Sequence, residues 1–83
     1  MGIPRRRSLQ KIMGKLAAVR LHVDKLRNTG DPNLARYWRK ELRSMLDDIR
    51  HHARMVGTRT ELEVMTRVIE FEKEIQDIPE IDA

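Results

Sequence analysis

The sequence predicts an all-α protein in which a long antiparallel helical hairpin and a shorter third helix form a three-helix bundle. Apolar residues recur at alternating spacings of three and four in three successive segments, and no alternating apolar run indicates a strand. At 83 residues the chain is a single domain, and it has no cysteine for a disulfide. We expect a flexible basic arm over 1–7, a three-helix domain over 8–78 with helices at about 8–28, 32–56 and 60–77, and a short tail over 79–83.

The first predicted helix follows the basic arm, and Ser8 is its expected N-cap. An unbroken a/d seam runs along it, formed by Leu9, Ile12, Leu16, Val19, Val23 and Leu26. Gly14 weakens this helix by about 1 kcal/mol relative to alanine. The helix should end near Asn28, with Gly30 adopting the left-handed conformation that terminates many helices.

The second predicted helix has the clearest start in the chain. Asp31 stands at the N-cap position, and Pro32 follows at the first helical position, a combination typical of helix starts. The core-facing stripe of this helix consists of Ala35, Trp38, Leu42, Met45, Ile49, His52 and Val56. Gly57 is expected to end it.

The third predicted helix begins after Thr58 or Thr60, because each threonine is followed three residues later by a glutamate, as in a capping box. Its apolar stripe is formed by Val64, Val68, Phe71, Ile75 and Ile78, and a second apolar flank by Leu62, Met65 and Ile69. Pro79 ends the helix.

The short turn over 29–32 should fold the first two helices into a hairpin, whose apolar stripes need a further cover. The residues expected in the core or at an interface are Leu16, Val19, Val23, Trp38, Leu42, Met45, Ile49, Val68, Phe71 and Ile75. The cover is either the third helix of the same chain or a second copy. We favour a homodimer, because the third helix has a wide apolar face and so short a chain buries little surface alone.

Charge is distributed unevenly along the chain. Residues 1–59 carry fifteen basic and five acidic side chains, a net charge of +10, whereas residues 60–83 carry two and eight, a net charge of −6. This asymmetry indicates either a basic surface for an anionic partner or two halves that neutralise each other in the folded protein.

The basic residues favour contact with nucleic-acid phosphates. The expected contacts are Arg36, Arg39, Lys40, Arg43, Arg50 and Arg54 on the outside of the second helix, together with Arg5, Arg6 and Arg7 in the arm. Arginine presents a forked set of donors that suits phosphate. The third helix is too acidic to serve as the recognition helix of a helix-turn-helix motif, because phosphates would repel it. The alternative is an ordinary solvated charged face.

The sequence holds little that indicates catalysis. It has no cysteine, its two serines have no evident base, and Gly30 and Gly57 look like helix ends rather than a phosphate loop. Asp48 lies three residues before His51 and four before His52, and carboxylate-x-x-His is half of a di-metal site. The remaining carboxylates are missing, and simple helix-surface pairing explains the cluster. We therefore expect no enzyme activity, no cofactor and no metal.

A binding role without nucleic acid is the main alternative function. The wide apolar helical surfaces would then serve a protein–protein adaptor, an inhibitor or an assembly factor. Membrane binding is disfavoured, because no apolar run approaches the length of a membrane span and the stripes lack interfacial aromatics. With no secretory segment and no cysteine, we expect a cytoplasmic protein.

Overall fold

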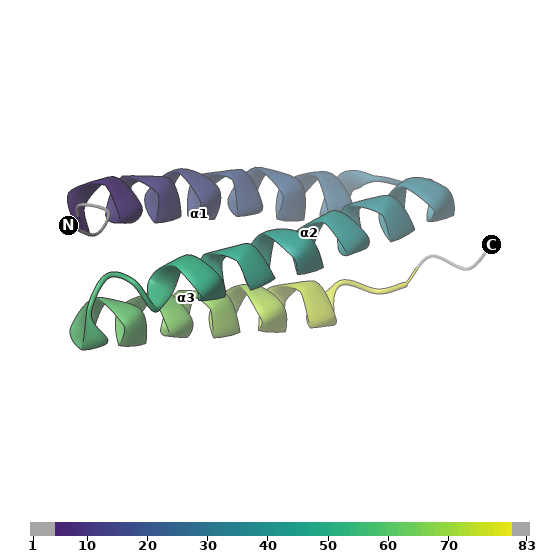
Figure 1. Cartoon of the computed structure of the whole chain (residues 1–83). Helices are drawn as coiled ribbons and strands as arrows, with labels where there is room; N and C mark the ends of the chain where they lie inside the picture. The colour runs from purple at the N-terminus through teal and green to yellow at the C-terminus, as the bar shows by residue number, and fades with distance from the viewer. Residues whose placement is uncertain (1–4, 81–83) are drawn as a thin grey trace.

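The computed structural model describes residues 5–80, with side chains from Arg7 onward, and confirms the all-α three-helix bundle. Helix α1 spans Arg5–Asn28, α2 spans Pro32–Ala53 and α3 spans Thr58–Asp77. The three helices run alongside one another, with the two turns at opposite ends of the molecule (Figure 1). The bundle is elongated, with principal extents of 50 × 18 × 15 Å. Within residues 5–80 there is no strand.

Helix α2 packs against both other helices, whereas α1 and α3 approach each other less closely. The buried hydrophobic residues are Ile12, Val19, Val23, Leu26, Ala35, Leu42, Leu46, Ile49, Ala53, Val56, Val64, Val68 and Ile78. Half-buried side chains of Leu16, Trp38, Met45, Phe71 and Ile75 pack against this core. All ten predicted core residues therefore lie in the core or at its edge. Each fully buried Leu, Ile or Val contributes about 1.5–3 kcal/mol of hydrophobic free energy.

Helix α1 begins earlier than the sequence suggested. It starts at Arg5, so Arg5–Arg7 belong to the helix rather than to a preceding arm, and Ser8 is a buried residue inside α1 rather than its N-cap. Arginine has a high helix propensity, which favours this extension of the helix. The other predicted arm residues, 1–4, and tail residues 81–83 lie outside the described residues, as do the side chains of Arg5 and Arg6.

The turn between α1 and α2 is closed by Asp31, as predicted. The Asp31 carboxylate accepts a hydrogen bond of 2.9 Å from the backbone N–H of Asn33, and Pro32 occupies the first turn of α2. The prediction for Gly30 is wrong, because Gly57 is the one residue with a positive φ in the described part of the chain. Instead, the Thr29 N–H bonds the Lys25 carbonyl at 3.0 Å, and α1 ends without a left-handed residue.

The connection between α2 and α3 also differs from its prediction. Helix α2 ends at Ala53, three residues before the predicted end, although Val56 remains buried in the turn. Gly57, with φ 100° and ψ 154°, occupies the N-cap of α3, and no side chain caps this helix. The expected capping boxes are therefore absent, because Thr58 already lies inside α3 and a side-chain-free residue takes the cap position.

None of the three helices in residues 5–80 combines the length and apolar character that crossing a membrane requires.

Candidate nucleic-acid interface

Four cations form a stripe along the outer face of α2 and its C-cap residue Arg54, which we call the α2 basic face: Arg36, Lys40, Arg43 and Arg54. At 100° per residue they lie within about 60° of one another around the helix axis and extend over roughly 27 Å. All four side chains are exposed. Within residues 5–80 none of them makes an ion pair. Their positive charge is therefore available to an anion from solvent.

Arg39 was predicted to belong to this surface, but it turns toward α3. Its guanidinium donates hydrogen bonds to the carbonyl oxygens of Ile75, at 3.3 Å, and Ile78, at 2.9 Å. These carbonyls lie at the C-terminal end of α3, where helical carbonyls lack intrahelical partners and carry partial negative charge. Arg39 therefore caps α3 and fastens it to α2, and it is not a free phosphate ligand.

Arg50 is also engaged within the molecule. One nitrogen of its guanidinium donates to Asp47 at 2.8 Å, and the other forms an ion pair with Glu72 of α3. Arg50 thus links α2 to α3, and two acidic groups offset its charge. Asp47, which is two-thirds exposed, is the one acid within the stripe of cations.

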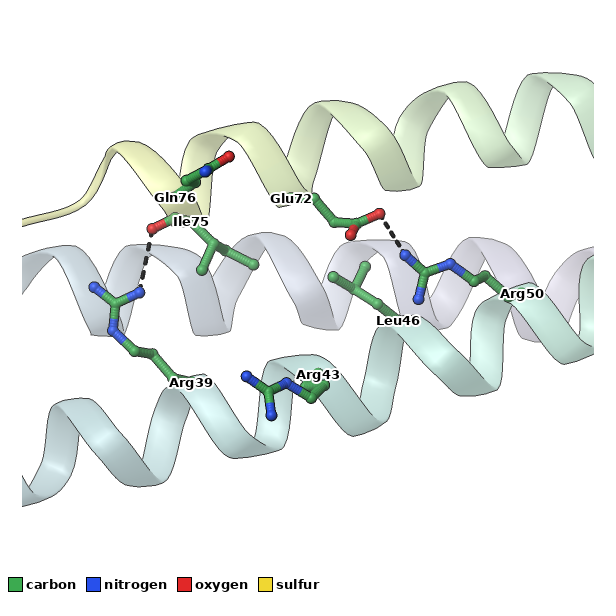
Figure 2. Close-up of a pocket in the computed structure, with 7 residues that line it drawn as sticks. All are labelled: Arg39, Arg43, Leu46, Arg50, Glu72, Ile75 and Gln76. Atoms are coloured by element: carbon green, nitrogen blue, oxygen red, sulfur yellow. Dashed lines mark hydrogen bonds and ion pairs between the residues drawn. The ribbon is translucent and has the colours of Figure 1, made fainter.

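Arg43 lies between these two engaged arginines, at the edge of a groove between α2 and α3 (Figure 2). The groove has a volume of about 300 Å³, and its lining includes Leu46, Ile75 and Gln76. Figure 2 joins Arg39 and Arg50 to α3 by dashed lines but draws none from Arg43. Arg43 is therefore the arginine of this groove that is best placed to bind an external anion.

Two lysines of α1, Lys15 and Lys25, each contact a side chain of α2. Lys15 forms an ion pair with Asp48 of α2, and this hydrogen bond is the largest cause that lowers the pKa of the Asp48 carboxyl below its ordinary value of 3.8. Coulombic attraction from Lys15 and His52 acts in the same direction. The ammonium group of Lys25 lies 5.0 Å from the ring centroid of Trp38, a cation–π contact across the hairpin.

The acids of α3 reach α1 as well as α2. Glu74 accepts a hydrogen bond of 2.9 Å from Arg20 and lies 3.5 Å from Arg27. The hydrogen bond from Arg20 to Glu74 is the main cause that raises the pKa of the Arg20 guanidinium. Arg20 also lies 5.6 Å from the centroid of the Phe71 ring, so it connects α1 to α3 through both charge and packing.

The neutralisation that the charge asymmetry suggested occurs in part of the molecule. Glu72 and Glu74 neutralise arginines on the inner sides of α1 and α2, while the α2 basic face keeps its charge. Local spacing did not reveal the roles of these two glutamates, because the pairing depends on the register between helices. Residue spacing in the sequence reveals only ion pairs within one helix, whose members lie three or four residues apart.

An aromatic cluster adjoins the basic face near the turn between α1 and α2. Tyr37 packs edge-on against Trp38 at 4.9 Å between centroids, and His22 packs edge-on against Trp38 at 5.2 Å. His22 also contacts the Ala18 carbonyl through Nδ1, at 2.9 Å. The Tyr37 ring remains half-exposed beside Lys40 on the same side of α2.

The Asp–His cluster of α2 forms local side-chain contacts on the helix. His52 Nε2 lies 3.7 Å from an Asp48 oxygen whose carboxylate also pairs with Lys15, and the His51 and His52 rings lie edge to face. In the described part of the chain, no group of three or more His, Asp or Glu side chains is placed to hold a metal ion.

No family model, curated protein or solved structure matches this chain.

Proposed function

We propose that this protein is a non-enzymatic nucleic-acid-binding protein, and that the α2 basic face contacts the phosphate backbone. The observation that carries the proposal is the stripe of four exposed, unpaired cations on one side of a rigid helix. Arginine and lysine at such positions neutralise phosphates and release condensed counterions, which supplies most of the affinity in non-specific binding.

The packing of α2 supports backbone contact rather than reading of bases. Helix α2 is flanked by α1 and α3, so its outer face is one side of a bundle rather than a free rod that enters a groove. Its fixed cations point the same way over about 27 Å, which suits a run of phosphates along a duplex. We therefore expect weak sequence preference and steep dependence on salt.

The test is fluorescence anisotropy with a labelled generic duplex of DNA, and another of RNA, over a series of salt concentrations. Four phosphate contacts predict a slope of about −3.6 for the logarithm of affinity against the logarithm of salt concentration on duplex DNA. Absence of binding to either duplex at low salt contradicts the proposal and favours the adaptor, inhibitor or assembly-factor alternative.

The chain offers a matched pair of substitutions that separates a specific face from total charge. Lys40→Gln removes a cation from the α2 basic face, and Lys73→Gln removes one from an exposed position on α3. We expect Lys40→Gln to weaken binding several-fold and to reduce the salt slope by about 0.9, with little change for Lys73→Gln. Equal losses in the two variants would show that only net charge matters.

A further inference from the structure

The groove between α2 and α3 carries more positive charge than its own ion pair neutralises. Three arginines and one glutamate line it, which gives a formal charge of +2: Arg39, Arg43, Arg50 and Glu72. Glu72 pairs with Arg50, and Arg39 donates only to backbone carbonyls, which carry partial charge. Arg43 is exposed and has no ion-pair partner within residues 5–80. The groove is therefore complementary to an anion.

The rest of the lining suits a ligand that has an apolar body and a polar edge. Leu46 and the half-buried Ile75 supply apolar surface, and Gln76 supplies an amide that both donates and accepts hydrogen bonds. Arg39 and Arg50 are held by their bonds to α3, and the plane of a guanidinium group is a surface on which nucleobases stack. The volume of about 300 Å³ is at the lower end of the range for small-molecule sites.

Arg43 belongs both to this groove and to the α2 basic face, so one ligand can contact the two surfaces. Figure 2 shows Arg43 between Arg39 and Arg50 on the α2 side of the groove. A phosphate bound by Arg43 therefore brings its own sugar and base to the mouth of the groove. A base in an intact duplex remains stacked and paired, whereas an unpaired base leaves the stack at a lower energetic cost.

We propose that the groove takes up one unpaired base of the nucleic acid whose phosphates lie on the α2 basic face, a proposal that rests on the function proposed above. Arg43 binds the phosphate of that nucleotide, the base packs on Leu46 and Ile75, and the Gln76 amide bonds to the edge of the base. The groove has room for one nucleotide unit. The preferred substrate is therefore a duplex with a single unpaired nucleotide, such as a bulge.

Three DNA duplexes of otherwise identical sequence test the proposal. One is perfectly paired, one has a single-nucleotide bulge, and one has an abasic bulge, which keeps the extra sugar and phosphate but lacks the base. We expect anisotropy to show that the bulge with a base binds about five-fold or more tighter than the abasic bulge, the lower end of what stacking of one base contributes. Both bulged duplexes carry the same phosphates and interrupt the helix alike, so their comparison isolates the base.

Two matched pairs of variants locate the bound base. Arg43→Gln and Arg36→Gln each remove an exposed cation from the α2 basic face, but only Arg43 lines the groove. Both should weaken binding to the perfect duplex alike, and only Arg43→Gln should also reduce the preference for the base. Gln76→Ala should reduce that preference and leave the perfect duplex unaffected. Its control is Gln10→Ala, at an exposed position on α1, which should change neither.

The outcomes separate the groove from the function on which it rests. Equal affinity of the native chain for the bulge with a base and the abasic bulge overturns the groove assignment, while binding to the perfect duplex still supports phosphate contact. Absence of binding to all three duplexes overturns both. A preference for the base that survives Arg43→Gln and Gln76→Ala unchanged means that the base binds elsewhere, which also overturns the assignment.

Discussion

Asp48 shows how one side chain connects two helices and makes stability depend on pH. The hydrogen bond from Lys15 lowers its pKa in the folded protein below the ordinary 3.8. A lowered pKa means that the stabilisation is complete above pH 3.8 and is lost as the pH falls through the folded value. The carboxylate is nearly half-exposed, so solvent screens the pair.

Asp48→Asn should therefore lower the free energy of unfolding at neutral pH by less than about 1 kcal/mol. The difference from the native chain should shrink as the pH falls below 3.8 and Asp48 itself becomes protonated. Urea denaturation at neutral pH and at progressively lower pH measures it. Lys15→Met completes a double-mutant cycle, and additive losses at neutral pH would show that the two side chains do not interact.

The arginines of α2 have different roles in the structure, and the sequence alone could not distinguish these roles. Their spacing placed Arg39 and Arg50 on the same outer surface as Arg43, and along the helix they are indeed neighbours. The distinction among them comes from α3, which offers carbonyl oxygens to Arg39 and a carboxylate to Arg50 but no partner to Arg43. No local pattern encodes the register of α3 on α2, so the sequence could not separate these roles.

At the scale of the elements, strong local signals gave the correct boundaries and ambiguous ones did not. Asp31 and Pro32 define the start of α2, because a capping carboxylate and a fixed φ both favour that one position. Glycine is less informative. Gly30 and Gly57 both lie between two helices, but only Gly57, at the N-cap of α3, adopts a positive φ.

Three glycine-to-alanine substitutions test this account of the connections. Gly57→Ala should destabilise the protein by about 1–3 kcal/mol, because its φ of 100° and ψ of 154° lie in a region that only glycine adopts readily. Gly14→Ala should stabilise α1 by about 0.5–1 kcal/mol, since the position is an open helix interior. Gly30→Ala should be neutral or slightly stabilising, because its φ is not positive and nothing crowds it.

Thermal or urea denaturation of the three variants provides the measurement. A loss at Gly30 as large as that at Gly57 would mean that the first turn needs a left-handed residue after all, as the sequence alone had suggested.

At the scale of the whole molecule, the bundle distributes its charges unevenly between its inner and outer sides. The formal net charge of +4 conceals an acidic third helix whose Glu72 and Glu74 neutralise arginines that face it. These ion pairs hold α3 against a strongly basic hairpin, and they leave the outer side of α2 positive.

A pair of double variants tests whether the acids of α3 act through these particular ion pairs. Glu72→Gln/Glu74→Gln and Glu63→Gln/Glu80→Gln both raise the net charge by two, but only the first breaks contacts between helices. We expect the first double variant to lose about 1 kcal/mol of stability, at the scale of surface ion pairs, and the second to lose little.

Because Arg50 adjoins the α2 basic face, the first double variant should also bind duplex DNA more tightly than the second at low salt, an advantage that disappears at high salt. Equal stability and equal affinity of the two double variants would mean that α3 contributes diffuse negative charge, and that its register on α1 and α2 depends on apolar packing alone.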